Sequence, residues 1–151
     1  MHERDTPSPT DGDCVFCRIV RGELPAEIVY ADEDVLGILD INPIHYGHAL
    51  VIPRRHYEEF LDVPTTEFQG LFSAARRITA ALVESLDLEG YNVFSNNGRV
   101  AGQSVFHFHL HVVPRFRNDN IRLVHELRSY DRGEMAVWGE RIRTALAANR
   151  S

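Results

Sequence analysis

The run 105–114 is apolar apart from three histidines at every second position, His107, His109 and His111. Side chains of a β-strand point alternately to the two faces of the sheet, so the three imidazoles would share one face. On a helix they would fan out around the axis, and the β-branched and aromatic content also favours a strand. The sequence therefore predicts a strand over 105–113. Its other face would be apolar, formed by Phe106, Phe108, Leu110 and Val112.

Three consecutive histidines on one strand face, among eight in the whole chain, point to chemistry. A single histidine there would read as a structural residue of a half-exposed strand. Imidazole can act as a nucleophile, a proton carrier or a metal ligand near neutral pH. The histidine face is therefore the first candidate for a functional site.

The polar stretch 95–104 leads directly into this strand and contains Gly98 and Gly102. Glycine lets the backbone turn and lets a ligand approach closely. Gln103 and Ser104 then present N–H groups and polar side chains beside the histidines. Most glycine-rich connectors are only turns, but its position predicts a cradle for an anion such as phosphate.

Periodicity predicts an α+β fold in which an antiparallel meander sheet is covered on one face by one long helix. Expected elements are a short helix over 14–22, strands over 28–31, 35–40, 49–52 and 91–95, and a C-terminal helix over 133–148. The main helix follows 62–66 and ends before Gly90. Its core stripe is Phe68, Leu71, Phe72, Ala75, Ile78, Leu82 and Leu86.

Composition narrows the classes of function. The chain has 151 residues, 44% of them hydrophobic, which suits one domain with a sizeable core. A net charge of −6 lacks the basic footprint of a nucleic-acid binder, so a small substrate is expected. The sequence lacks a run of about 18 apolar residues, so no membrane span is predicted, and we expect no hydrophobic core of a signal peptide before the domain. We expect a cytoplasmic enzyme without a nucleic-acid or membrane partner.

The only two cysteines, Cys14 and Cys17, have the spacing of half a tetrahedral zinc site. Two further ligands would have to be histidines. A redox pair and two unrelated small core residues are the alternatives, although the βαβ context usual for a redox pair is missing. Both cysteines fit a reducing compartment.

Four ordered blocks of this chain resemble the histidine triad (HIT) superfamily of nucleotide hydrolases and transferases, especially its HINT-like, zinc-carrying bacterial members. The signature is Ala-Gly-Gln-Ser-Val-Phe-His-Phe-His-Leu-His-Val-Val-Pro-Arg over 101–115. The segments 14–26, 39–43 and 47–56 resemble its N-terminal and central blocks. The resemblance implies a HIT domain over 13–117, a flexible tail over 1–12 and a C-terminal extension over 118–151.

In zinc-carrying members of the superfamily, two histidines complete the ligand set, and they correspond to His56 and His107 here. The resemblance thus implies a structural zinc held by Cys14, Cys17, His56 and His107. As a ligand, His107 would fix the neighbouring catalytic strand. HIT hydrolases are commonly homodimers, which makes a second copy the expected partner.

The resemblance also implies covalent catalysis on a nucleotide. His109 would attack the α-phosphate and form a nucleotidyl-histidine, which water then hydrolyses, while His111 contacts the phosphate or the leaving group. For this, one ring nitrogen of His109 must present its lone pair and the other must donate to a fixed acceptor. We expect that acceptor to be the carbonyl of His107. Asn96, Gln103 and Ser104 would bind the phosphate.

The purine nucleoside would be bound by the first strands. Asp40 could accept from two ribose hydroxyls, or it could only cap the turn before Asn42 and Pro43. His48 lies near the site in the family pattern and would support the triad through a hydrogen bond. The residues expected to enclose the base are Phe16, Ile19, Leu39 and Ile41.

Three functions remain open. A nucleotidyl hydrolase would act on a phosphoramidate, an acyl-nucleotide or a dinucleoside polyphosphate. The hexose-1-phosphate nucleotidyltransferase branch carries Gln where this chain has His111, and a nucleotide-binding interaction module with vestigial catalysis would not need three histidines. Trp138 either packs on its own core or reaches the nucleotide site of a second subunit.

Overall fold

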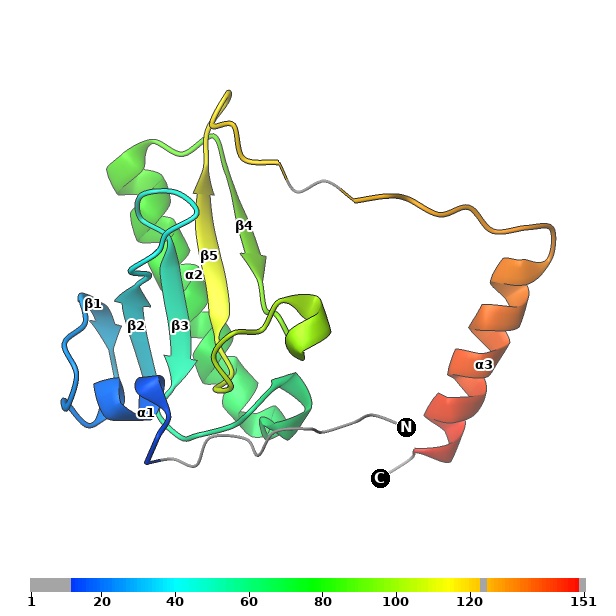
Figure 1. Ribbon diagram of the computed structural model, residues 1–151, viewed down its shortest axis with the longest axis horizontal. Helices are drawn as coiled ribbons and strands as arrows, with labels where there is room; N and C mark the ends of the chain where they lie inside the picture. The colour runs from blue at the N-terminus through cyan, green and yellow to red at the C-terminus, as the bar shows by residue number, and fades with distance from the viewer. Residues whose placement is uncertain (1–11, 123–124, 150–151) are drawn as a thin grey trace. The chain divides into compact units, whose positions relative to one another are not determined.

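The computed structural model describes residues 12–122 and 125–149. The expected tail over 1–12 lies almost wholly outside the described residues. Five antiparallel strands form one sheet in the order β1-β2-β3-β5-β4 (Figure 1). The strands are β1 (Ile28–Ala31), β2 (Val35–Leu39), β3 (Ala49–Pro53), β4 (Gly90–Phe94) and β5 (Leu110–Arg115). The helices are α1 (Val15–Val20), α2 (Phe68–Leu86) and α3 (Glu134–Ala148), with 3₁₀ turns η1 (Phe60–Asp62), η2 (Thr65–Glu67) and η3 (Arg99–Ala101).

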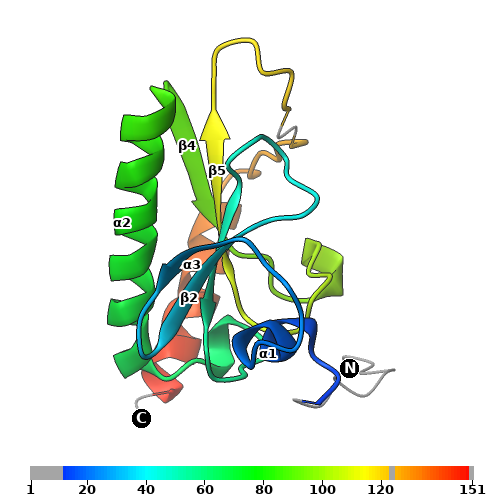
Figure 2. The ribbon, with the colours of Figure 1, turned by 90° about the vertical axis from the view of Figure 1, so that its left-hand side faces the viewer.

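The predicted antiparallel sheet with one long covering helix is confirmed. Neighbours in the sheet follow chain order except at one edge, where β5 lies between β3 and β4. Helix α2 covers one face of the sheet and the short α1 lies on the other (Figure 2).

Alternation along β2 separates two cores. Val35 packs in the core under α2, and Leu36 and Ile38 pack with α1 on the opposite face. Gly37 faces α2, where a Cβ atom would lie only 2.6 Å from Cδ1 of Ile78. The absence of a side chain at this position therefore allows α2 to approach the sheet closely.

Helix α2 buries a narrower stripe than expected. Its buried residues are Leu71, Ala74, Ala75, Ile78 and Thr79. Phe72 and Leu86, expected in the core, are 48% and 40% exposed. The sheet contacts only part of the helix circumference, so residues at the edges of the apolar stripe are left uncovered.

The predicted strand over 105–113 is wrong at its start, because β5 begins at Leu110. The backbone N–H of Phe108 donates to the carbonyl of Tyr57 at 2.6 Å, and the carbonyl of Val105 accepts from the Gln103 side chain. The Phe108 N–H and the Val105 carbonyl therefore form hydrogen bonds outside the pairing between strands. The apolar face is also shorter than expected, since Phe108 is buried but Phe106 is half-buried under the Arg99 guanidinium.

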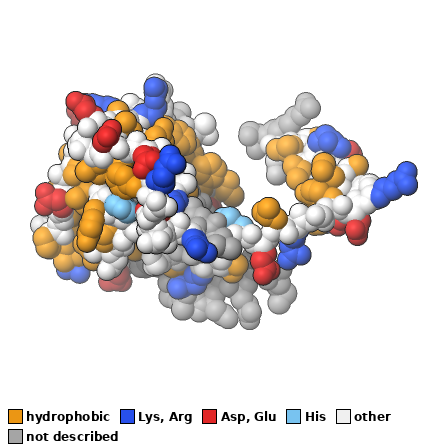
Figure 3. Space-filling view, turned by 90° about the horizontal axis from the view of Figure 1, so that it is seen from above, with side chains coloured by type: hydrophobic (Ala, Val, Ile, Leu, Met, Phe, Trp, Pro, Cys, Tyr) orange, Lys and Arg blue, Asp and Glu red, His pale blue; other side chains and the backbone are white. Residues whose placement is uncertain are grey.

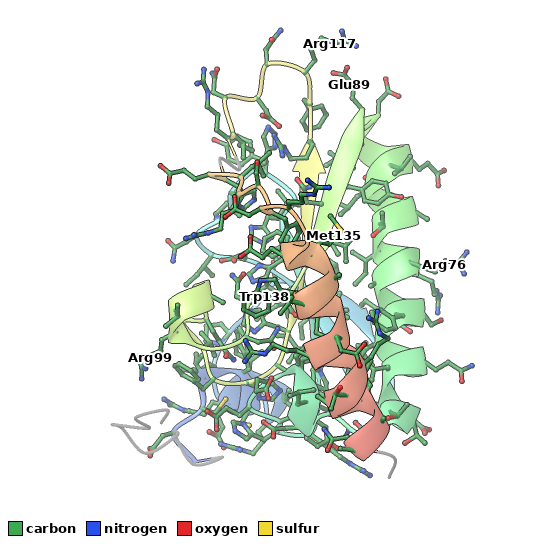
Figure 4. The ribbon with its side chains drawn as sticks, turned by 90° about the vertical axis from the view of Figure 1, so that its right-hand side faces the viewer. Arg76, Glu89, Arg99, Arg117, Met135 and Trp138 are labelled. Carbon is green, nitrogen blue, oxygen red and sulfur yellow. The ribbon has the colours of Figure 1, made fainter. Side chains whose placement is uncertain are left out.

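The C-terminal unit, 121–151, contains α3 as the sequence predicts. Within this unit no residue of α3 is buried and Trp138 is 45% exposed, and both alternatives for Trp138 stay predictions. Hydrophobic side chains gather on this unit in Figure 3, and Figure 4 shows Met135 and Trp138 one turn apart on α3. Among the described residues, no helix is long and apolar enough to cross a membrane.

Candidate functional site

A cluster of two thiols and two imidazoles lies between α1 and the segment before β5. Sγ of Cys14 is 3.4 Å from Nδ1 of His107, and Sγ of Cys17 is 3.3 Å from Nδ1 of His56. All four candidate ligand atoms lie within 4.8 Å of one another. The two cysteines lie together because Cys14 is the N-cap of α1 and the first helical turn brings Cys17 back beside it.

The cluster fits a tetrahedral zinc ion. Bonds of about 2.3 Å to sulfur and 2.1 Å to nitrogen place neighbouring ligand atoms roughly 3.5 Å apart, close to the distances seen here. Nε2 of His107 donates to the carbonyl of Pro53 at 2.8 Å, since a carbonyl can only accept. Nδ1 of His107 is then unprotonated and directed at the thiols, as a zinc ligand must be.

The nucleophile predicted from the sequence is anchored to this cluster. Nδ1 of His109 lies 2.7 Å from the carbonyl oxygen of His107 and donates to it, which confirms the expected acceptor. Nε2 therefore carries the lone pair. The ring of Phe16 packs edge-on against His109 at 5.1 Å, and burial lowers the pKa of His109 below its usual value. His109 is thus a neutral, oriented imidazole at pH 7.

A second hydrogen-bonded chain fixes His111. The backbone N–H of Ile44 donates to Nδ1 of His48 at 3.0 Å, so Nε2 of His48 carries the proton in the neutral ring. That proton is donated to Nδ1 of His111 at 2.9 Å, which leaves the proton of His111 on Nε2. Phe94 stacks on the His111 ring at 4.7 Å. Burial and the neighbouring His109 and His48 lower the pKa of His111 to about 4.

Asp40, His48 and His111 also bring ligand-type atoms within 4.8 Å of one another. The hydrogen bond from Ile44 argues against a metal there, because it puts a proton on the nitrogen of His48 that a metal would need. Oδ1 of Asp40 accepts from the N–H of Asn42 at 2.9 Å, so Asp40 caps this turn, which was one of its two predicted roles. Oδ2 of Asp40 lies 3.8 Å from Nε2 of His48, which places the carboxylate beside the triad.

The expected base-enclosing residues are only partly brought together. Phe16 of α1 is buried against the ring of His109, and Ile19 packs against the same apolar cluster as Phe16. Leu39 contacts the core under α2, on the wrong face of the sheet for this role, and Ile41 is 89% exposed. Strand alternation places Ile38 on the α1 face instead. Residues 35–39 include no polar side chain, so their pattern carried no signal for this register.

The polar loop before the triad is shaped by Gly98 and Gly102, which have φ angles of 85° and 92°. Ser104 is exposed and Asn96 is half-buried, as residues that meet a ligand should be. Gln103 differs, because it is 5% exposed and both ends of its amide bond to protein groups. The phosphate contact expected of its side chain is not favoured by this arrangement.

A neutral histidine that is held by the carbonyl of a histidine in the cluster of two thiols and two imidazoles, with a third histidine beside it, defines a histidine triad site. The model of the HIT domain family matches residues 21–118, well over half of the chain. The chain belongs to the HIT family.

Solved structures and curated relatives agree with this assignment. SMU.412c from Streptococcus mutans is 38% identical with a TM-score of 0.86, and the match covers 91% of this chain and 87% of that one. A Zn-bound histidine triad family protein from Mycobacterium smegmatis is 43% identical with a TM-score of 0.71, covering 92% and 96%. Adenylylsulfatase HINT3 of Arabidopsis thaliana is 38% identical over 123 residues, covering 82% of this chain and 62% of that protein.

Proposed function

We propose that this protein is a nucleotidyl hydrolase that cleaves at the α-phosphate of a purine nucleotide through a nucleotidyl-histidine intermediate. The observation that carries the proposal is the 2.7 Å hydrogen bond from Nδ1 of His109 to the carbonyl of His107. Burial lowers the pKa of His109 and keeps the ring neutral, and the hydrogen bond places its proton on Nδ1. Nε2 is then unprotonated, which is the state needed for attack on phosphorus.

The reaction would proceed in two displacements. Nε2 of His109 forms a bond to the α-phosphorus as the bond to the leaving group breaks, and the leaving group takes the electron pair. Nε2–H of His111 donates a hydrogen bond to a phosphate oxygen or the leaving atom. Water then attacks phosphorus, the phosphorus–nitrogen bond breaks, one proton passes to solvent, and the nucleoside monophosphate is released.

The leaving group defines the substrate class. Phosphoramidates, acyl-nucleotides and dinucleoside polyphosphates share an α-phosphate with a replaceable substituent. The name of the Arabidopsis relative adds adenylyl sulfate, in which the substituent is sulfate. An anhydride partner such as sulfate, phosphate or carboxylate leaves as an anion, whereas an amine must take up a proton as it leaves.

The test is a substrate panel with the purified protein. AMP release from adenosine phosphoramidate, adenylyl sulfate and diadenosine polyphosphates is measured for the wild type and for His109→Ala. Turnover that depends on His109 supports the proposal. Transfer of AMP to an added hexose 1-phosphate, faster than to water, would favour a nucleotidyltransferase, and binding without turnover would favour an interaction module.

Zinc is the proposed structural cofactor at Cys14, Cys17, His56 and His107. The donor set, the 3.3–3.5 Å spacing and the zinc-bound relative support it. When bound, zinc supplies a covalent anchor for the segment that precedes β5. His107 would transmit this order to His109 through its own carbonyl.

A second copy of the chain is the proposed partner. Strand β4 is at the sheet edge beside an exposed apolar strip of α2 and β4, formed by Phe72, Val83, Tyr91 and Val93. Arg76, which projects from α2 in Figure 4, and Glu84 flank this strip. Two antiparallel copies of α2 crossing at Ala80 would pair Arg76 of one copy with Glu84 of the other. Light scattering of the wild type and of Val93→Arg tests this, with a monomeric wild type as the contrary result.

A further inference from the structure

The amide of Gln103 joins three separate segments of the backbone. Its Nε2 donates to the carbonyls of Glu58 at 2.7 Å and Val105 at 3.1 Å, and its Oε1 accepts from the N–H of Gly98 at 2.8 Å. An amide nitrogen has two protons to donate, so both are used. A buried amide with this set of partners is costly to redirect toward a substrate.

Asn97 makes a second tie between the same loop and the same segment. Its Oδ1 accepts from the N–H of Phe60 at 2.8 Å, and its Nδ2 donates to Oγ of Ser95 at 2.9 Å. The loop is therefore fastened to 58–60 at both of its ends.

The segment that receives both ties is itself connected to the rest of the site. It follows His56 of the proposed zinc site, and the carbonyl of Tyr57 accepts from the N–H of Phe108, the residue before His109. The loop over 95–104, the proposed metal ligands and His109 are thus all connected to the short segment 56–60.

Each tie is next in sequence to one of the two candidates for phosphate binding. Asn96 precedes Asn97, and Ser104 follows Gln103. In each pair, one residue bonds to protein while its neighbour is accessible to a ligand. Holding one member of a pair restricts the directions open to the other, since the peptide plane between them is rigid.

We infer that Gln103 and Asn97 are positioning residues that hold Asn96 and Ser104 against the α-phosphate, and that Gln103 does not touch the substrate. The inference rests on the proposed function, because it requires a phosphate at this loop. It replaces the direct contact that the sequence predicts for Gln103 with an indirect one.

The test measures what the phosphate adds to binding. Calorimetry gives the dissociation constants of adenosine and of AMP for the loop without substitutions, Asn97→Ala, Gln103→Glu and the double variant, all with His109→Ala so that no nucleotidyl-histidine can form. Gln103→Glu keeps the size of the side chain but sets a carboxylate oxygen against the carbonyls of Glu58 and Val105. Val100→Ala is the matched control, because Val100 is fully exposed on the same loop.

We expect each single variant to lower the preference for AMP over adenosine by about tenfold, the factor for one hydrogen bond to a charged group. The double variant should lose little more than the larger single loss, because both ties hold the same loop. Adenosine affinity and zinc content should stay at the control value. Amide hydrogen exchange of 95–105 should rise in both single variants.

Three other outcomes overturn the inference. Loss of the AMP preference in Gln103→Glu but not in Asn97→Ala, with unchanged exchange of the loop, means that Gln103 contacts phosphate directly. Faster exchange with an unchanged AMP preference means that the ties only stabilise the fold. Equal binding of AMP and adenosine already in the background without loop substitutions refutes a phosphate site here, and the proposed function with it.

Discussion

The two faces of the sheet are held by different interactions. Under α2, the buried cluster consists of apolar side chains such as Val51, Leu71 and Phe108, and the buried Thr79 bonds within the helix itself. On the α1 face, two thiols pack beside apolar side chains such as Phe16, and the buried His107 and His109 adjoin them. Area burial is tolerant of small shifts, whereas hydrogen bonds and metal ligands require set distances. We therefore expect the α2 face to contribute mainly to the stability of the fold, and the α1 face to set the positions of the site residues.

The largest effect is expected at the nucleophile. His109→Ala should lower kcat by about three orders of magnitude or more, because no other group in the site presents a comparable lone pair. Nucleotide affinity and the melting temperature should stay near wild type. Intact mass spectrometry with a slow substrate should detect a nucleotidyl adduct on the wild type and none on the variant. Turnover close to wild type in the variant would refute the mechanism.

A substitution at the proposed zinc site should affect both metal content and stability. Cys17→Ala removes one of four ligands, so elemental analysis should fall from about one zinc per chain to a small fraction, and the melting temperature should drop. Catalysis should fall with it, because His107 holds His109. His109→Ala should keep its zinc. A metal-free wild type with full activity would contradict the assignment.

The matched substitution on the other face separates stability from geometry. Leu71→Ala in α2 should lower the free energy of unfolding by about 2–5 kcal/mol, the range for a buried leucine. Leu71 is 1% exposed and packs in the cluster under α2. The folded variant should retain wild-type zinc content and kcat in assays well below its melting temperature. Loss of zinc in Leu71→Ala would show that the two faces are coupled.

Asp40 tests whether a structural contact and a substrate contact can coexist on one side chain. Asp40→Ala should weaken ribonucleotide binding by about 1–3 kcal/mol, the range for a hydrogen bond to a charged group, and weaken 2′-deoxynucleotides less. One oxygen already caps the turn at Asn42. Equal weakening of both sugars would assign Asp40 to the turn alone.

Short-range patterns predicted most of the fold. Short apolar runs bounded by turn residues located β1 and β3 within one residue, and period 3.6 located α2 and α3. The order of the strands in the sheet became known only from the strand pairing, because β5 lies between β3 and β4 and so departs from chain order. Spacing within a segment carries no information about such long-range neighbours.

The errors at the site have the same origin. Alternation suggests that the strand begins at Val105, but Phe108 bonds to Tyr57, about fifty residues away in the chain. The bond from the Gln103 side chain to the carbonyl of Glu58 is equally remote, so the sequence gives no sign of it. By contrast, the acceptor for His109 was predictable, because it is the carbonyl two residues earlier on the same chain.

The smallest effect is expected in the pH dependence of stability. The pKa of His111 is about 4 in the folded protein, below the ordinary 6.5, so its neutral form stabilises the fold fully above pH 6.5. That contribution is lost as the pH falls from 6.5 toward 4. His111→Gln cannot titrate, so between pH 7 and pH 5 it should lose about 1 kcal/mol less stability than wild type, allowing for the partial exposure of His111. Urea denaturation at both pH values, with zinc present, measures the difference. His125→Gln, an exposed control, should behave as wild type. An equal loss in wild type and His111→Gln would show that burial and the neighbouring His109 and His48 do not hold His111 neutral.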